Sequence, residues 1–350
     1  MLPTRAYAVA AARQPLAPFS IDRREPGPKD VLIDILYCGV CHTDIHFVRN
    51  EWGNSVFPMV PGHEIVGRVA QVGAQVSRYQ VGVAVGVGCF VDSCRVCPHC
   101  LAKEEQFCEK WPITTYNGMD PKTGTITYGG YSTRITVDED YVLRIPASIP
   151  LDRAAPLLCA GITTYSPMRH HGVKAGDRVA VVGLGGLGHM AVKFAAAFGA
   201  KVTVLSTSPA KREDALALGA SDFAATADGA VFKERAGQFD FVFDTVSAPH
   251  DYNAYLGLLR VDGVMVLLGV PETPAPVAAM VLASKRRVLT GSFIGGIAQT
   301  QEMLDFCAEH GVASDIELIP VQQVDAAYER MLRGDVRYRF VIDIASLDAD

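Results

Sequence analysis

The sequence of 350 residues has no uninterrupted run of about 18 apolar residues, the length that a membrane-spanning helix requires. Its longest apolar stretches, residues 179–192 and 274–283, are interrupted by glycines or prolines. The first residues, Met1 to Arg5, lack the basic start and long apolar core of a secretory signal. Internal repeats and low-complexity segments are also missing. These absences favour a cytoplasmic protein with no membrane partner.

Positive charge is in deficit, with 32 Lys and Arg against 38 Asp and Glu and a net charge of −6. This balance argues against a nucleic-acid partner, because such proteins usually carry a basic excess. It also fits poorly with an anionic membrane surface. Hydrophobic residues at 49% and charged residues at 20% are typical of a globular chain that buries a sizeable core. The length predicts two domains, at roughly 150 residues each.

Cysteine, in contrast, is plentiful, with nine residues. In a reducing compartment this indicates metal binding or catalysis more than disulfides. Four of the thiols follow the spacing C-x₂-C-x₂-C-x₇-C, which can enclose one Zn²⁺ as a closed, structural site; they are Cys94, Cys97, Cys100 and Cys108. An iron–sulfur cluster is the alternative for four thiolates. His99 lies inside this segment and is interpreted as a bystander.

A second set of metal-ligand residue types is spread along the chain. Residues 39–46 contain Cys41, residues 61–64 contain His63 followed by Glu64, and Cys159 stands alone far downstream. Two thiolates and one imidazole hold a tetrahedral zinc with one position open for water or substrate. Glu64 can stand behind these ligands or enter as a temporary fourth. The alternative is that the thiols are small buried hydrophobes and the histidine a hydrogen-bonded core residue.

Short apolar strands with glycine and proline turns indicate a partly open β-barrel in the first part of the chain. We expect strands at residues 5–10, 31–37, 65–72, 85–90, 130–137 and 141–145. A helix is expected over residues 151–171. The chain returns to this domain at its end, through helices at 299–310 and 324–333 and a strand at 338–344.

The middle of the chain alternates strands and helices. Strands are expected at 178–182, 201–205, 239–244, 264–268 and 287–293, and helices at 189–198, 208–218 and 252–260. This alternation predicts a doubly wound parallel sheet of about six strands. After the first of these strands comes a G-x-G-x-x-G motif, Gly183-Leu184-Gly185-Gly186-Leu187-Gly188. A motif placed between strand and helix predicts a dinucleotide site, with the pyrophosphate at the helix N-terminus. A glycine-rich turn without a ligand is the alternative.

The end of the second strand of this sheet points to the type of dinucleotide. NAD-binding proteins place a carboxylate there for the ribose 2′-hydroxyl. This chain has no carboxylate before Glu213 and instead offers hydroxyls and cations: Ser206, Thr207, Ser208, Lys211 and Arg212. Such groups suit a 2′-phosphate, so we predict NADP(H). The alternative is that Ser208 caps the helix and the two cations form a solvated face.

These motifs occur in the order found in the zinc-dependent medium-chain alcohol dehydrogenases, and the whole chain resembles that family. It is most similar to the NADP-dependent branch of cinnamyl alcohol dehydrogenase-like enzymes and broad aldehyde reductases. The resemblance rests on residues 39–46, 62–64, the four-cysteine segment, Cys159, the glycine motif, residues 206–211 and residues 291–295. It implies a GroES-like domain over 1–152 with a structural-zinc lobe at 89–110. A Rossmann domain over 153–297 and a return segment over 298–350 complete the implied organisation.

The resemblance also implies roles. Cys41, His63 and Cys159 would hold a catalytic zinc, with Glu64 able to enter its shell; Thr43 would pass the alcohol proton on, and His46 would exchange it with solvent. The cofactor would be lined by Thr163, the glycine motif with His189, Ser206, Thr207, Lys211, Gly269, Ser292, Phe293 and Ile294. Candidate substrate contacts are Trp52, Cys89, Trp111, Val270 and Phe293. Two zinc ions per chain and a homodimer through the edge strand at 288–293 are further implications.

We therefore expect a zinc-dependent oxidoreductase that interconverts primary alcohols and aldehydes, aliphatic or aromatic, and favours aldehyde reduction. One departure is visible: the family turn "Gly-Asp-x-Val" is replaced here by Gly82-Val83-Ala84-Val85. Two rival hypotheses remain at this point. One is a zinc-free quinone or enoyl reductase of the same fold, and the other is a non-catalytic zinc-ribbon protein that senses nucleotides.

Overall fold

The computed structural model describes residues 1–271 and 273–348. The chain divides into two compact units, Met1–Ile162 with Gly295–Asp350, and Thr163–Ile294. This division falls later in the chain than the predicted boundary at 152/153 and earlier than the predicted one at 297/298. The cause of the first difference is that α3 (Leu151–Ala154) and the 3₁₀ turn η3 (Ala155–Leu158) pack on strands of the first unit. The last two residues of the predicted return segment lie outside the described residues.

The first unit is built around β3 (Asp30–Gly39), a nearly continuous buried strand. It pairs antiparallel with β4 (Ile65–Val72), β8 (Arg134–Asp138) and β17 (Arg339–Asp343). The full order is β16-β17-β3-β4-β5-β9, with β16 (Ile316–Pro320), β5 (Ala84–Val87) and β9 (Leu143–Arg144). Among the described residues this order does not close on itself, as expected for a partly open barrel.

Smaller elements complete this unit. β1 (Leu2–Ala8) and β2 (Ala17–Arg23) form a hairpin, and β6 (Phe90–Asp92) pairs with β7 (Ile113–Thr114). The helices are α1 (His42–Val48), α2 (Pro98–Leu101), α10 (Ile297–His310) and α11 (Val324–Leu332), with short 3₁₀ turns η1 (Glu105–Phe107), η2 (Glu139–Tyr141), η5 (Val321–Gln323) and η6 (Ile344–Asp348). The chain passes to the second unit within α4 (Ala160–His170).

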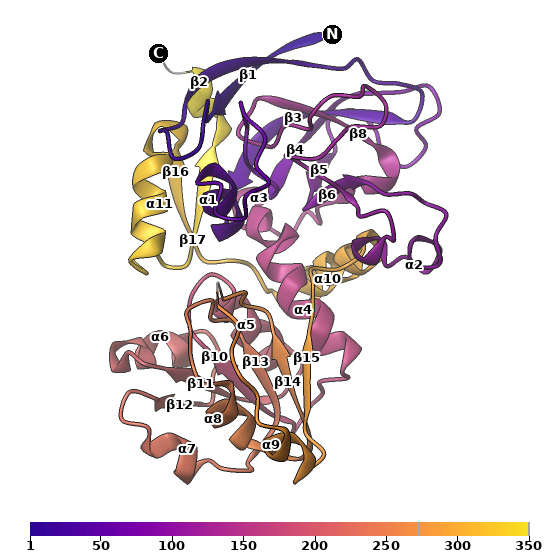
Figure 1. The fold of residues 1–350 in the computed structure, drawn as a ribbon. Coiled ribbons are helices and arrows are strands. Elements are labelled where there is room, and N and C mark those ends of the chain that lie inside the picture. Colours follow the sequence, from indigo (N-terminus) through magenta and orange to yellow (C-terminus); the bar gives the residue numbers. More distant parts are fainter. Residues whose placement is uncertain (272, 349–350) are drawn as a thin grey trace. The chain divides into compact units, whose positions relative to one another are not determined.

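The second unit holds a six-stranded parallel sheet in the order β12-β11-β10-β13-β14-β15, which confirms the predicted doubly wound fold. Its strands are β10 (Arg178–Val182), β11 (Lys201–Ser206), β12 (Asp222–Ala225), β13 (Phe239–Asp244), β14 (Leu259–Leu267) and β15 (Val288–Gly291). Helices α5 (Gly188–Ala197), α6 (Arg212–Ala217), α7 (Ala230–Glu234), α8 (Tyr252–Gly257) and α9 (Ala279–Ala283) connect or flank them (Figure 1). The order reverses beside β10, where such folds bind their ligands.

Several predicted elements differ from the structure. Residues 85–90 do not form one strand, because pairing with β4 ends at Val87 and Phe90 pairs with β7 instead. The helix predicted to reach residue 260 stops at Gly257, because Leu259 is fully buried and already pairs with Phe239 of β13. Residues 42–48, for which no helix was predicted, form α1. The short strands β2, β12 and β16 had no prediction.

The unusual turn is at the surface. Gly82 has a left-handed φ of +89°, and its N–H donates to Val69 O at 2.8 Å. Val81 and Val83 are both exposed there. Nothing in the structure explains the loss of the polar family residue.

None of the helices in residues 1–271 and 273–348 combines the length and hydropathy needed to cross a bilayer.

Candidate functional site

Three stretches of the first unit bring the predicted catalytic ligands together. Cys41 follows β3 at the start of α1, His63 precedes β4, and Cys159 follows η3. Cys41 Sγ lies 3.9 Å from Cys159 Sγ, and His63 Nε2 lies 3.3 Å from Cys159 Sγ. All three are buried, and together with Glu64 they offer ligand atoms within 4.8 Å of one another. Ligands at zinc distances from one centre are about 3.5–3.8 Å apart, so the donor set fits a tetrahedral zinc.

Asp44 fixes this arrangement from behind. Its fully buried carboxylate accepts the N–H of Cys41 at 2.9 Å and of Gly62 at 3.3 Å. The same carboxylate lies 3.4 Å from His63 Nδ1 and accepts the hydroxyl of Tyr131 at 3.3 Å. A proton held on Nδ1 leaves Nε2 free to bind a metal. Sequence reasoning assigned Asp44 no role. Its place three residues after a ligand cysteine, at a helix start, is the signal that could have found it.

Glu64 forms a buried ion pair. Its Oε1 contacts Nη2 of Arg339 on β17, and both side chains are almost completely excluded from solvent. Its Oε2 has no hydrogen-bond partner within the part of the chain that the structure describes. A Cβ on Gly39 would lie 1.9 Å from this oxygen, so only glycine leaves it room. Burial raises the pKa of Glu64 to about 7, against the opposing charge of Arg339. Arg339 was not anticipated.

The two thiols of this set differ in proton affinity. A hydrogen bond with Cys159, aided by His63, lowers the pKa of Cys41 well below its ordinary value despite burial. The same hydrogen bond raises the pKa of Cys159. The thiolate is the form that binds a metal, so Cys41 is prepared for that role.

The predicted relay residues lie on α1. Thr43 is half-buried and His46 stands one turn later. His46 Nδ1 lies 2.5 Å from Glu51 Oε2, and its ring stacks on Trp52 with centroids 4.9 Å apart. The carboxylate of Glu51, which sequence reasoning missed, orients the imidazole and leaves Nε2 available for proton exchange.

The candidate substrate contacts are divided between the two units. Trp52 contacts Phe47, which contacts Tyr116, which in turn stacks on His63. This aromatic chain connects His46 with His63 of the predicted metal-ligand set. Cys89 faces Leu158 O at 3.7 Å, and Trp111 is 63% exposed. Val270 and Phe293 belong to the second unit and are exposed there.

The four-cysteine segment forms a second cluster. All four sulfurs lie within 4.8 Å of one another, with Cys94 Sγ 3.8 Å from Cys100 Sγ. Backbone N–H groups of Val96 and Cys97 lower the pKa of Cys94 to about 6. The nine cysteines of the chain are all free thiols. Four thiolates saturate a tetrahedral zinc, so this cluster fits a structural ion with no open position.

In the second unit, the glycine motif connects β10 with α5. Gly183 has a φ of +87°, and a Cβ on Gly188 would lie 2.3 Å from Gly183 O. A Cβ on Gly185, in contrast, would meet nothing within 4 Å. The first and last glycines are thus required by the turn, and the middle one leaves the open space that a phosphate would use.

Most of the other predicted cofactor residues of this unit lie at the carboxyl ends of its parallel strands. Ser206 ends β11, where its buried Oγ accepts the N–H of Ser208 at 3.3 Å. Gly269 follows β14, and Ser292, Phe293 and Ile294 follow β15. Thr163 stands on α4, and His189 is buried on α5. This shared edge is where doubly wound sheets bind ligands.

The predicted hydroxyl and cation group is only partly brought together. Lys211 Nζ donates to Leu184 O of the glycine motif at 2.9 Å. Arg212 instead packs on the ring of Phe223 and donates to its carbonyl at 3.1 Å. Thr207 is exposed, and Ser208 starts the 3₁₀ turn η4 (Pro209–Lys211) without a capping hydrogen bond from its side chain.

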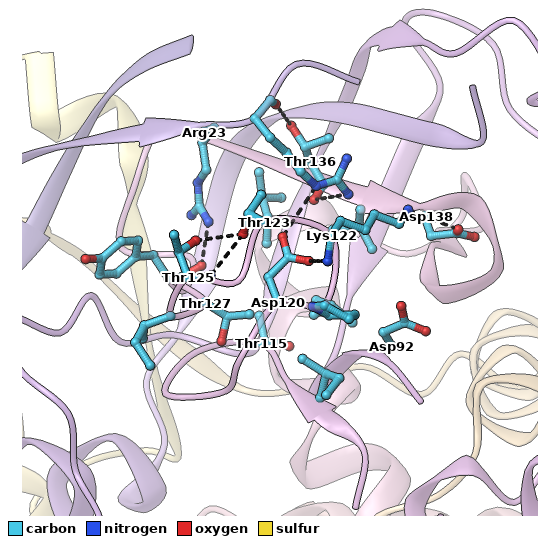
Figure 2. Close-up of a pocket in the computed structure, with 18 of the residues that line it drawn as sticks. Arg23, Asp92, Thr115, Asp120, Lys122, Thr123, Thr125, Thr127, Thr136 and Asp138 are labelled. Atoms are coloured by element: carbon cyan, nitrogen blue, oxygen red, sulfur yellow. Dashed lines mark hydrogen bonds and ion pairs between the residues drawn. The ribbon is translucent and has the colours of Figure 1, made fainter. Parts of the chain in front are cut away.

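Figure 2 shows a different pocket, of about 90 Å³, in the first unit. Two of the cations that line it, Lys122 and Arg23, are already paired. Lys122 Nζ contacts Asp30 at 2.7 Å and Asp138 at 3.3 Å. Arg23 donates to the carbonyls of Tyr128 and Gly129 at 2.7 and 2.9 Å. These groups support the surrounding loops and form no catalytic set.

Known protein families match segments of both units. The family profile described as an alcohol dehydrogenase GroES-like domain matches residues 27–147, and that of a zinc-binding dehydrogenase matches residues 186–309. The chain is 59% identical over 343 residues to "NADP-dependent alcohol dehydrogenase C 1" of Mycolicibacterium smegmatis, covering 98% of each. It is 53% identical to "Aldehyde reductase YahK" of Escherichia coli, covering 98% of this chain and 99% of that one. A cinnamyl alcohol dehydrogenase structure from Sorghum bicolor superimposes with a TM-score of 0.95 at 48% identity, covering 98% of each chain.

We predict that Cys100→Ala lowers the zinc content by about one ion per chain and lowers the melting temperature, because a closed thiolate site contributes folding free energy. Activity per folded molecule should change far less. The measurements are metal analysis and thermal unfolding. Cys307→Ala serves as the control, since it removes a buried thiol outside both clusters. Unchanged zinc content and melting in Cys100→Ala would contradict the assignment.

Proposed function

Because this chain belongs to the zinc-dependent medium-chain alcohol dehydrogenases, we propose that it interconverts primary alcohols and aldehydes with NADP(H) and favours aldehyde reduction. The observation that carries the proposal is the open set of Cys41, His63 and Cys159. The names of its relatives support the direction and the cofactor, since they include an NADP-dependent alcohol dehydrogenase and an aldehyde reductase. The aldehyde itself is proposed only as a class, aliphatic or aromatic.

The metal roles follow from the two clusters. Cys41, His63 and Cys159 would hold the catalytic zinc, with Glu64 able to approach through its unpartnered Oε2. The second cluster would hold the structural zinc. When bound, the catalytic zinc supplies Lewis-acid polarisation of the substrate oxygen, and NADPH supplies the hydride.

The residues of α1 handle the proton. Thr43 would hydrogen-bond the substrate oxygen, donating its proton in aldehyde reduction and accepting one in alcohol oxidation. His46 stands one helical turn away and would exchange that proton with solvent. Glu51 holds Nδ1 of His46 and so keeps the imidazole in one orientation.

The second unit would bind the cofactor at the carboxyl edge of its sheet. The N-terminus of α5 and the space at Gly185 would receive the pyrophosphate. Ser206, Thr207 and Lys211 would contact the 2′-phosphate. Arg212 is tied to Phe223, so we assign it a weaker contribution than Lys211. Thr163, Gly269 and residues 292–294 would line the remainder.

Neither rival hypothesis accounts for the buried ligand set. A zinc-free quinone or enoyl reductase does not need two thiols and an imidazole within 4.8 Å of one another. A nucleotide sensor with a zinc ribbon needs only the four-cysteine cluster. Metal analysis separates the three, because the proposed enzyme requires two zinc ions per chain.

We also propose cytoplasmic action. Its support is that six of the nine cysteines lie in the two thiol-containing clusters and that all nine are free thiols, as is typical of a reducing compartment.

Cys159→Ser should abolish turnover but leave a folded protein that still binds NADPH, because the ligand set and the glycine motif lie in different units. The measurements are aldehyde-dependent NADPH oxidation, zinc content and NADPH fluorescence. Cys307→Ser is the control, because it changes a buried thiol outside both metal clusters. Turnover like that of the wild type would overturn the assignment of Cys159 as a ligand.

Ser206→Asp should lower kcat/KM with NADPH by about tenfold to hundredfold, through the loss of charge-assisted hydrogen bonds and repulsion of the 2′-phosphate. Activity with NADH should hold or rise. Lys211→Ala should weaken NADPH use in the same direction and leave NADH use nearly unchanged. Lys201→Ala, an exposed lysine at the start of the same strand, is the control. A wild-type preference for NADH, or equal losses with both cofactors, would contradict the 2′-phosphate assignment.

The homodimer is a further part of the proposal. β15 is the last strand in the order of the parallel sheet, and Val288 on it is 44% exposed. An edge strand of this kind can pair with a second copy. Light scattering should give twice the chain mass for the wild type. A charge introduced by Val288→Lys should shift the protein toward the monomer, whereas a monomeric wild type would refute the proposal.

A further inference from the structure

The segment after β13 supports the glycine motif. Thr245 donates its N–H and its hydroxyl to Val182 O, at 3.1 and 2.7 Å, where β10 enters the motif. A Cβ on Gly183 would lie 2.7 Å from Val246 Cγ2, and one on Gly269 would lie 2.3 Å from Val246 O. Thr245 and Val246 therefore pack directly between two of the stretches proposed to line the cofactor.

His250, which follows this segment, contacts the residue just before it, Asp244. Its Nε2 lies 2.8 Å from Asp244 Oδ2, and its Nδ1 lies 2.8 Å from Ala248 O. A carboxylate and a carbonyl oxygen are both acceptors only. A neutral imidazole has a single N–H, whereas the imidazolium can donate to both. The geometry thus requires the protonated ring to satisfy the two contacts together.

The surroundings of His250 favour that charge. Asp244, on β13, is 1% exposed, and its other oxygen accepts the N–H of Val246 at 3.1 Å. Asp251, just before α8, adds a second negative charge. The rings of Tyr252 and Tyr255 on α8 contact the imidazole with centroids 4.9 and 5.3 Å away. The hydrogen bond to Asp244 raises the pKa of His250 above its ordinary value, despite its burial.

We propose that His250, as an imidazolium bonded to Asp244 and Ala248, is a positioning residue that holds residues 245–249 against the glycine motif for NADP(H) binding. This inference rests on the proposed function. The side chain of His250 is 15% exposed, so it can exchange its proton with water. Deprotonation removes one of the two N–H donors of His250, so the segment loses one of the two hydrogen bonds that this side chain makes.

The protonation of His250 makes its support of the glycine motif depend on pH. A group whose pKa is raised by folding contributes its stabilisation below its ordinary pKa and loses it as the pH rises through the raised value. The support that His250 gives to the glycine motif is therefore present in mildly acidic solution and is lost as the pH rises through the raised pKa.

The test is NADPH binding to the zinc-loaded full chain, followed by cofactor fluorescence from about pH 6 to about pH 9.5, a range that spans an ordinary and a raised histidine pKa. His250→Gln keeps one donor but carries no charge. We expect its Kd to exceed that of the wild type by about threefold to tenfold at the acidic end, the factor for one hydrogen bond. The ratio of the two Kd values should approach one at the alkaline end. Because both proteins bind the same cofactor, titration of the cofactor itself does not affect this ratio.

Asp244→Asn is the second variant, and it keeps the experiment decisive if His250→Gln does not fold. In the wild type, Kd should rise toward alkaline pH as His250 loses its proton. Loss of the Asp244 charge should move this rise to lower pH. His170→Gln, an exposed histidine of the same unit, should reproduce the wild-type profile. A Kd ratio that is constant with pH would assign His250 a merely structural role and overturn the proposal, as would a ratio of one throughout. Failure of the wild type to bind NADPH at any pH would instead refute the proposed function.

Discussion

The buried carboxylate of Asp44 is the interaction on which the metal-ligand set depends. It accepts hydrogen bonds from the backbone at Cys41 and Gly62, and it faces Nδ1 of His63. The stretches that carry Cys41 and His63 are separated along the sequence, and one carboxylate holds both of them. Its position at the first turn of α1 also satisfies a donor that a helix start leaves unpaired. The same side chain thus begins the helix that carries Thr43 and His46 and orients the imidazole for a metal.

A buried carboxylate needs compensation, and the first unit provides it twice. Asp44 is surrounded by hydrogen-bond donors, whereas Glu64 is paired with Arg339 from the end of the chain. Removing one partner of such a buried pair typically costs about 3–5 kcal/mol, because the other charge remains uncompensated. The return segment is therefore part of the site. It delivers the guanidinium through β17, which pairs directly with the carboxyl end of β3.

The sequence was most informative where chemistry demands a fixed residue type. The two thiol sets, His63, the glycine motif and the alternation of strands and helices were all visible, because metal ligation and tight turns permit few substitutions. Long-range partners were not visible. Arg339 is an ordinary charged residue whose role appears only when β17 lies beside β3. Asp44 and Glu51 act on residues close to them in the sequence, but their residue types alone do not distinguish them from surface carboxylates. Four-residue strands such as β12 are too short to give a periodic signal. The contribution of Arg212 to the 2′-phosphate site was overestimated, because its stacking on Phe223 depends on tertiary packing.

The two thiol clusters are held by different physical means. The open set lies at the ends of β3 and β4 and beside η3, where the buried sheet and the carboxylate of Asp44 order the ligands. The four-cysteine segment itself forms only short elements, α2 and η1, beside the short strand pair β6 and β7. Its large apolar side chains point to solvent, with Val96 71%, Leu101 68% and Phe107 46% exposed. A lobe that buries so little apolar surface needs the metal for its folding free energy. One cluster is thus prepared by the fold for chemistry, and the other substitutes for a hydrophobic core.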